Sequence, residues 1–185
     1  MSSFLEEVLE AGVDAIQIRE KEAEAGEILR LAEPFRDAAE RHGALFIVND
    51  RPDVALALEA DGVHLGQGDL PVGAARDVLG PDAIIGLSAH TTEQLDRAPA
   101  EADYVCAGPV WATPTKPRRP AAGLDVVRHA AQSQDRPWFA IGGITSANLS
   151  EVVAAGARRV VVVRAVTEAR DPAAAVSALR SGLPD

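Results

Sequence analysis

Short apolar runs rich in β-branched residues alternate along the chain with longer stretches that have apolar residues at helical spacing. The intervening stretches, such as the one containing Ile28, Leu31 and Phe35, are typical of amphipathic helices. Repeated strand–helix units predict an α/β protein with a parallel sheet. The strand-like runs span Asp14–Glu20, Ala44–Asp50, Gly62–Gly66, Ala83–Ala89, Tyr104–Gly108, Pro137–Gly143 and Arg159–Ala165.

The number of units favours a closed (βα)8 TIM barrel over a doubly wound open sheet. We expect all 185 residues to form a single TIM-barrel domain. A barrel of this type opens with a strand, but here a helix-like segment, Phe4–Ala11, precedes the first strand-like run. The first strand of the barrel is therefore expected to be missing, which would leave unpaired sheet edges.

The amino-acid composition limits the kinds of molecule that this chain is expected to bind. The formal net charge of −10 argues against nucleic acid, whose binding depends on neutralising phosphates, but not against a small phosphorylated substrate. The single cysteine, Cys106, excludes an internal disulfide and is expected in the core. No apolar run approaches the length of a membrane span and no signal-peptide pattern is present, so we expect a cytoplasmic protein without a membrane partner. The sequence leaves open whether the chain is a homo-oligomer.

The first strand-like run alternates between apolar and polar side chains. Ile16 and Ile18 are expected to face the helices, which leaves Gln17, Arg19 and Lys21 on the inner face near the C-terminal end of the strand. Barrel active sites lie at that end. The alternative is an ordinary solvated strand end, but an unpaired charge on an interior face is costly, which favours a functional role.

Two acids follow the next two strand-like runs, Asp50 directly after Asn49 and Asp69 in the segment that begins with Val63. Carboxylate oxygens suit Mg²⁺, which usually takes one or two of them and completes its coordination with water and substrate phosphate. The alternative is that each aspartate caps the helix that follows it.

Further along, Ser88 and His90 alternate with Leu87 and are expected to face the interior. Ser88 offers a hydrogen-bond donor to a phosphate, whereas an isolated histidine such as His64 or His90 is more often structural. His42 and His129 fall in expected helices and receive no role.

Candidate phosphate contacts cluster in the second half of the chain. The long loop Pro109–Ala122 has the length typical of a binding loop and carries hydroxyls and cations. The last two strand-like runs end in a glycine pair and in a valine–arginine pair, where barrels of this kind often bind phosphate. The residues concerned are Thr113, Thr115, Lys116, Gly143, Val163 and Arg164.

Six motifs occur in one order over nearly the whole chain: QIREK from Gln17, NDR from Asn49, DGVHLGQGDLP from Asp61, GLSAH from Gly86, the segment Ala102–Lys116, and AIGGI from Ala140. In this set the chain resembles the thiamine phosphate synthase and thiazole tautomerase family. The resemblance implies a transferase that joins a pyrimidine methyl diphosphate to a thiazole phosphate and releases pyrophosphate.

The resemblance also implies a role for each matching residue. Asp50 and Asp69 look like the ligands of a Mg²⁺ cofactor, and Arg19, Lys21, Ser88 and Lys116 look catalytic through charge stabilisation of the leaving group. The implied pyrimidine diphosphate site is Gln17, Arg19, Lys21, Asn49, Ser88 and Lys116. The implied thiazole phosphate site is Thr113, Thr115, Gly143, Val163 and Arg164. Arg164 stands where many relatives carry serine.

Two other functions remain open. The paralogous thiazole tautomerase would use His90 as an acid–base residue, but it handles no diphosphate and has no need of paired aspartates. A non-catalytic phosphate-binding protein, or an inactive fragment, is the third candidate because of the missing strand.

Overall fold

The computed structural model describes residues 2–114 and 120–184. These residues form two compact units, and the division lies between Gly86 and Leu87. Within these residues seven strands follow one another in sequence order. The expectation of a single domain stays a prediction. Thr115 and Lys116 lie outside the described residues.

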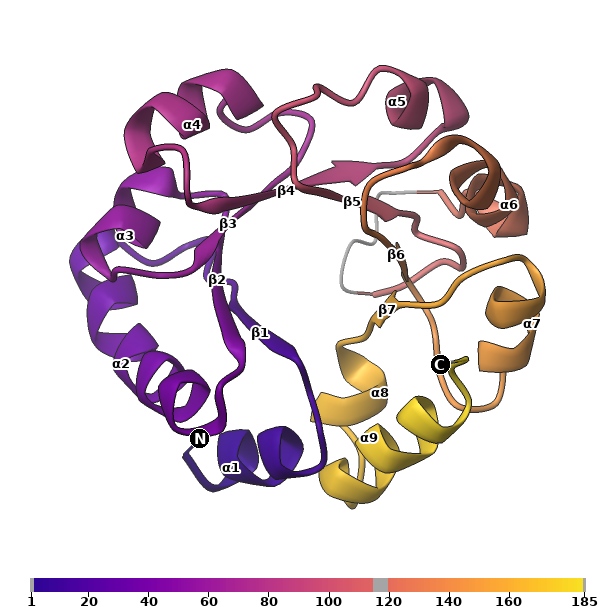
Figure 1. The fold of residues 1–185 in the computed structure, drawn as a ribbon. Helices are drawn as coiled ribbons and strands as arrows, with labels where there is room; N and C mark the ends of the chain where they lie inside the picture. The colour runs from indigo at the N-terminus through magenta and orange to yellow at the C-terminus, as the bar shows by residue number, and fades with distance from the viewer. Residues whose placement is uncertain (1, 115–119, 185) are drawn as a thin grey trace. The chain divides into compact units, whose positions relative to one another are not determined.

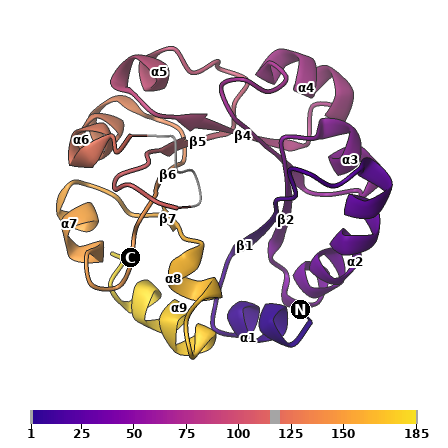
Figure 2. The ribbon, with the colours of Figure 1, turned by 180° about the vertical axis from the view of Figure 1, so that it is seen from behind.

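The first unit consists of strand–helix repeats that follow an N-terminal helix (Figure 1). In sequence order its elements are α1 (Ser2–Glu10), β1 (Ala15–Ile18), α2 (Ala25–His42), β2 (Leu45–Asn49), α3 (Pro52–Ala57), β3 (Gly62–Leu65), α4 (Val72–Leu79) and the beginning of β4 (Ile84–Ala89). Strand β1 pairs in parallel with β2, and β2 with β3, so that Ile16 lies opposite Phe46 and Val48 opposite Val63. Figure 2 gives the reverse view of the same repeats.

Burial along β1 follows the alternation of its sequence. Ile16 and Ile18 are buried, at 8% and 4% exposure, whereas Gln17 is exposed. Helix α2 buries Ile28 against this side, and the ring of its Phe35 lies 6.5 Å from that of Phe46 on β2. The expected orientation of β1 is confirmed: its apolar side chains pack under helices and its polar side chains face away from them.

The second unit continues the repeat (Figure 1). After the end of β4 come α5 (Thr92–Asp96), β5 (Tyr104–Ala107), α6 (Gly123–Ser133), β6 (Trp138–Ile141), α7 (Leu149–Ala154), β7 (Val160–Val161), α8 (Arg164–Thr167) and α9 (Pro172–Ser181). Strand β6 pairs in parallel with β5 and with β7. Cys106 on β5 is buried at 2% exposure, as expected of a core residue. Tyr104 packs edge-on against Phe139 across the β5–β6 pair.

The last strand is shorter than its sequence predicts. The expected strand Arg159–Ala165 is wrong beyond Val161, because the partner strand β6 ends at Ile141 and Gly142 then turns away with φ of 100°. Without a strand beside it, the chain enters helix α8, and the carbonyl of Val163 accepts hydrogen bonds from the first turn of that helix. Arg164 therefore begins a helix instead of ending a strand.

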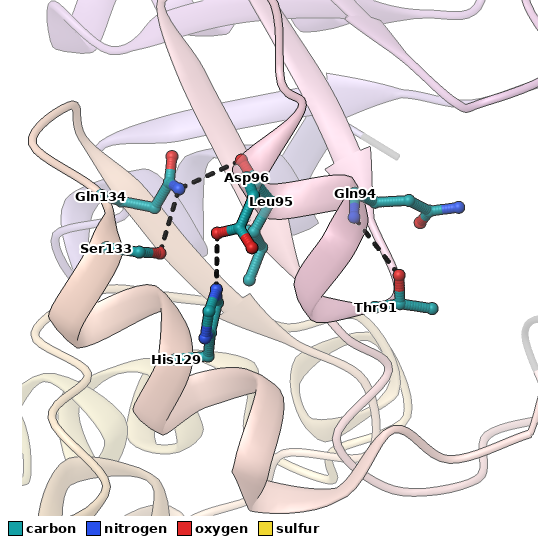
Figure 3. A network of polar contacts seen from close by, with 7 residues as sticks. All are labelled: Thr91, Gln94, Leu95, Asp96, His129, Ser133 and Gln134. Carbon is teal, nitrogen blue, oxygen red and sulfur yellow. Dashed lines mark hydrogen bonds and ion pairs between the residues drawn. The ribbon is translucent and has the colours of Figure 1, made fainter.

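A polar network joins α5 to α6 within the second unit, as Figure 3 shows. Thr91 caps α5 by accepting from the N–H of Gln94. His129 on α6 contacts Asp96 at 2.6 Å, and the amide of Gln134 donates to the carbonyl of Leu95 at 3.2 Å. His129 is thus structural, and His42 likewise contacts Glu6 at 2.6 Å between α2 and α1. No helix in the described part of the chain combines the length and apolar character needed to cross a bilayer.

Candidate functional site

Two acids and a lysine meet at the C-terminal ends of the strands of the first unit. Parallel pairing sets Asn49 beside His64, and the N–H of Asp50 then donates to the carbonyl of His64 at 2.8 Å. The ammonium of Lys21, beyond β1, pairs with the carboxylate of Asp50. Asp69, beyond β3, shares a side-chain hydrogen bond with Asp50. Residues from three separate loops thus converge.

Neither aspartate caps a helix, so the capping alternative is wrong. Helix α3 begins after Arg51 and α4 after Pro71, and neither N-terminus has a side-chain cap. Asp69 turns back instead, and its Oδ2 accepts from the N–H of Gly66 at 2.7 Å. Both carboxylates are therefore available for other chemistry at this end of the sheet.

Asp50 also has an unusual backbone. Its φ is 65°, in the left-handed region that residues other than glycine occupy infrequently. Such conformations persist where the surroundings enforce them, and they cluster at functional sites. The backbone here holds the carboxylate toward Lys21 and Asp69 at a cost in conformational energy.

The pKa values of the two carboxyls are shifted in opposite directions. Burial raises the pKa of Asp50, but hydrogen bonds to Lys21 and Asp69 and the positive charges of Lys21 and Arg19 outweigh it, so this pKa is lowered. The pKa of Asp69 is raised, first by burial and then by its hydrogen bond to Asp50. Opposite shifts of this kind are typical of two carboxyls that share a site and titrate as a coupled pair.

The donor set suits a hard divalent ion. The described residues contain no group of three or more histidine, cysteine, aspartate or glutamate side chains arranged to hold a metal. A site with two carboxylates fits Mg²⁺, which keeps waters and binds substrate phosphate oxygens, better than it fits a metal that needs an all-protein cage.

Three further residues predicted for the diphosphate site, Gln17, Arg19 and Asn49, belong to the same strands or to the loops that follow them. Gln17 and Arg19 are exposed at the end of β1, and Arg19 acts electrostatically on Asp50. Asn49 is 9% exposed, and its side-chain Nδ2 has no hydrogen-bond acceptor among the described residues. Because buried donors are nearly always satisfied, this amide points to an acceptor supplied by a ligand.

The second unit contains a cavity of about 260 Å³. Five residues that the sequence assigned to substrate binding line it: Ser88, Thr113, Gly143, Val163 and Arg164. Thr115 and Lys116, predicted for the same loop as Thr113, lie outside the described residues. The guanidinium of Arg164 pairs with Glu168 at 2.7 Å, one turn along α8.

Glycines form one wall of this cavity because no other residue fits there. Gly142 and Gly143 have φ of 100° and 68°, which favour glycine. A Cβ on Gly142 would lie 2.3 Å from that of Pro109, and one on Gly143 would lie 2.8 Å from that of Trp111. The glycines are therefore required by the close packing of this wall against Pro109 and Trp111.

Sequence reasoning missed several residues of this cavity. Gly108 accepts a hydrogen bond from Nδ1 of His90 at 2.6 Å, which fixes the histidine ring, and Thr145 lies on the wall next to the glycines. The backbone N–H of His90 donates to Gln94 at 2.7 Å. The motif GLSAH identified His90 as a candidate residue. Gly108 and Thr145 have no distinctive sequence pattern of their own, and only the pairing of β5 with β6 shows that they belong to this cavity.

Paired carboxylates at strand ends and a glycine-walled cavity, on parallel strand–helix repeats, define an enzyme of the (βα)8-barrel class, with seven strands among the described residues. Residues 1–166 match the family model described as thiamine monophosphate synthase. The chain belongs to this family, and it is a transferase. The resemblance inferred from the six motifs is confirmed.

Individual relatives agree with the family. The chain is 60% identical to a thiamine-phosphate synthase of Acidothermus cellulolyticus over 96% of this chain and 85% of that protein. It is 52% identical to the thiamine-phosphate synthase of Mycobacterium tuberculosis, over 99% of this chain and 88% of that protein. A solved thiamine phosphate pyrophosphorylase from Pyrococcus furiosus matches with a TM-score of 0.90 at 37% identity, over 98% of this chain and 88% of that one. The expected fold is confirmed.

Proposed function

We propose that this chain condenses an aminopyrimidine methyl diphosphate with a thiazole phosphate to give thiamine phosphate and pyrophosphate. The observation that carries the proposal is the cluster of Lys21, Asp50 and Asp69, which suits a departing diphosphate. The partners would be these two small phosphorylated molecules, and we expect the reaction in the cytoplasm. The names of the relatives support this assignment.

The first unit would bind the diphosphate. Asp50 and Asp69 would hold Mg²⁺, which when bound neutralises charge on the leaving pyrophosphate. Lys21 and Arg19 place two further positive charges near the same carboxylates. Preorganised charges of this kind stabilise the charge that develops as the carbon–oxygen bond breaks, and one such group often contributes roughly 10²–10³ in rate. Lys116 would add a further cation, and Gln17 and Asn49 would bind the pyrimidine through their amides.

The cavity of the second unit would bind the thiazole phosphate. Its glycine wall offers main-chain N–H groups, and Thr113 offers a hydroxyl. Ser88, which the resemblance assigned to the pyrimidine diphosphate site, lines this same cavity. The chemistry needed here is limited: the thiazole nitrogen has a lone pair and needs no base, so positioning replaces proton transfer. Arg164 would reach the phosphate by leaving Glu168.

The tautomerase alternative has weaker support. It would use His90 for proton transfer, and the contact of Nδ1 with the carbonyl of Gly108 fixes this ring without deciding between the two reactions. The acid pair Asp50 and Asp69, held together by an unusual backbone, would serve no purpose in a reaction without a diphosphate.

A reconstituted assay tests the proposal. The purified chain is mixed with both substrates and Mg²⁺, and pyrophosphate and thiamine phosphate are measured together. We expect equal amounts of the two products and no turnover in the presence of a chelator. Pyrophosphate release without the thiazole would indicate a hydrolase, and product formation without any metal would remove the roles given to Asp50 and Asp69.

A further inference from the structure

The backbone carbonyls of the glycine wall are all held by donors. The carbonyl of Ile141 accepts from the N–H of Val110 at 2.8 Å, and that of Gly142 accepts from the N–H of Trp111 at 3.1 Å. The next carbonyl, that of Gly143, accepts from the side-chain Nδ2 of Asn148 at 3.0 Å. Three consecutive carbonyls are thus fixed, two by backbone and the third by a side chain.

Asn148 makes a second contact with the same loop. Its Oδ1 accepts from the N–H of Thr145 at 2.8 Å, so that one amide group spans the turn from Gly143 to Thr145. Asn148 occupies the N-cap position of α7, where asparagine normally accepts from the first turn of the helix. Here the side chain makes no such cap. Both of its polar atoms are used by the loop that lines the cavity.

The consequence for the cavity is electrostatic. In a trans peptide the C=O and the following N–H point in opposite directions. Holding the carbonyl of Gly143 toward Asn148 therefore turns the N–H of Ile144 to the other side of that peptide, and both residues line the cavity. Were this peptide to flip, a carbonyl oxygen would take the place of a donor and repel a phosphate.

We propose that Asn148 is a positioning residue for the phosphate of the substrate bound in the second unit: it fixes the Gly143–Ile144 peptide with its donor toward the ligand. This inference rests on the proposed function, since it takes that ligand to be the thiazole phosphate. It adds a residue that touches no substrate but sets the orientation of the group that does.

Steady-state kinetics of three variants test it. For Asn148→Ala we expect the KM for the thiazole phosphate to rise about tenfold or more, by analogy with residues that orient metal ligands, whose loss typically costs 10–100-fold. The KM for the pyrimidine diphosphate should not change. Asn148→Asp keeps the acceptor for Thr145 but sets an oxygen against the carbonyl of Gly143, so it should behave like the alanine variant. Ser150→Ala, at an exposed position on α7, is the matched control and should behave as the unmodified chain does.

A phosphate titration separates the inference from the proposed function. Inorganic phosphate is added to ¹⁵N-glycine-labelled protein, and the amide signals of Gly142 and Gly143 are followed by NMR. We expect Asn148→Ala to need about tenfold more phosphate than the unmodified chain, by the same comparison. If the unmodified chain makes no thiamine phosphate but the titrations differ as expected, the proposed function alone is wrong.

Three results would overturn the role of Asn148. One is an unchanged thiazole phosphate KM in the alanine variant, and another is an equal rise in both KM values. The third is full activity of Asn148→Asp, which would mean that the contact with Thr145 suffices. If the alanine variant does not fold, the aspartate variant and its phosphate titration decide the question alone.

Discussion

The two units present different kinds of chemical group at their proposed substrate sites. The first gathers charged side chains, with Lys21 on Asp50 and Asp69 beside them. The second presents main chain around Gly142 and Gly143, fixed by hydrogen bonds from Val110, Trp111 and Asn148. A leaving group gains charge during reaction and needs charge to meet it, whereas a phosphate that stays attached needs a shaped cradle. The contrast predicts that variants in the first unit affect turnover and those in the second affect substrate affinity.

The largest effect should come from Asp50→Asn. Asparagine tolerates a left-handed backbone, so the variant should fold, but it removes a charged oxygen from the acid pair. We expect kcat to fall roughly 10²-fold or more, as for loss of one preorganised group. Initial rates of pyrophosphate release measure this. Asp53→Asn, which alters an exposed carboxylate on α3 paired with Arg51, is the control and should stay near the unmodified rate. An equal loss of kcat in both variants would contradict a specific role of Asp50 in turnover.

Asp69→Asn tests whether this residue is a ligand of Mg²⁺. With one carboxylate left, the Mg²⁺ concentration for half-maximal rate should rise roughly tenfold or more, since metal sites lose much of their affinity with each ligand charge. The requirement of the unmodified chain should also increase as pH falls, because the raised pKa of Asp69 lets protons compete with the ion at milder acidity. A Mg²⁺ dependence identical in the variant and the unmodified chain would contradict a ligand role.

In the second unit Gly143→Ala should raise the KM for the thiazole phosphate with a smaller change in kcat. The new Cβ would lie 2.8 Å from that of Trp111, in addition to the strain at φ of 68°. Gly123→Ala separates the two causes, since Gly123 has a similar φ of 73° but open space around it. Both should lose about 1 kcal/mol of stability through φ alone, measured by denaturant unfolding. A shift in KM for Gly123→Ala as well would mean that backbone strain, and not the wall, is responsible.

The smallest effect concerns α1, which contributes no residue to either proposed site. Hydrogen bonds first from His42 and then from Arg41 lower the pKa of Glu6 below its ordinary value of 4.5. A lowered folded-state pKa stabilises above the unfolded-state pKa, and this contribution is lost as pH falls through the folded-state value. Glu6→Gln should therefore melt at a lower temperature than the unmodified chain near neutral pH, and the difference should vanish in acid. A difference that grows in acid would contradict this sign.

The alternation of apolar and polar residues, and the order of the strands along the chain, predicted much of the first unit. Ile16 and Ile18 faced the helices as expected, and acids after neighbouring parallel strands came together because such strands end at one edge. The sequence could not show that Asp69 turns back to Gly66, since this depends on the conformation of the intervening loop. Nor could it show the φ of Asp50, which follows from its contact with His64 across the strands.

The second unit was less predictable because its cavity depends on main chain. Ser88, Thr113, Gly143, Val163 and Arg164 line it, but Arg164 begins a helix because β6 ends early. The two hydrogen bonds of Asn148 reach across a turn, and an asparagine before a helix ordinarily predicts a cap. Side-chain type predicted which residues gather, but not how the peptides between them are turned.

The backbone of Asp50 has a consequence for engineering. A glycine at this position would relieve any cost of the left-handed conformation, but it would also remove the carboxylate and its ion pair with Lys21. Such a substitution would therefore exchange a proposed metal ligand for little gain in stability. Mutant libraries designed to increase thermal stability should keep Asp50 unchanged and vary exposed helix positions instead.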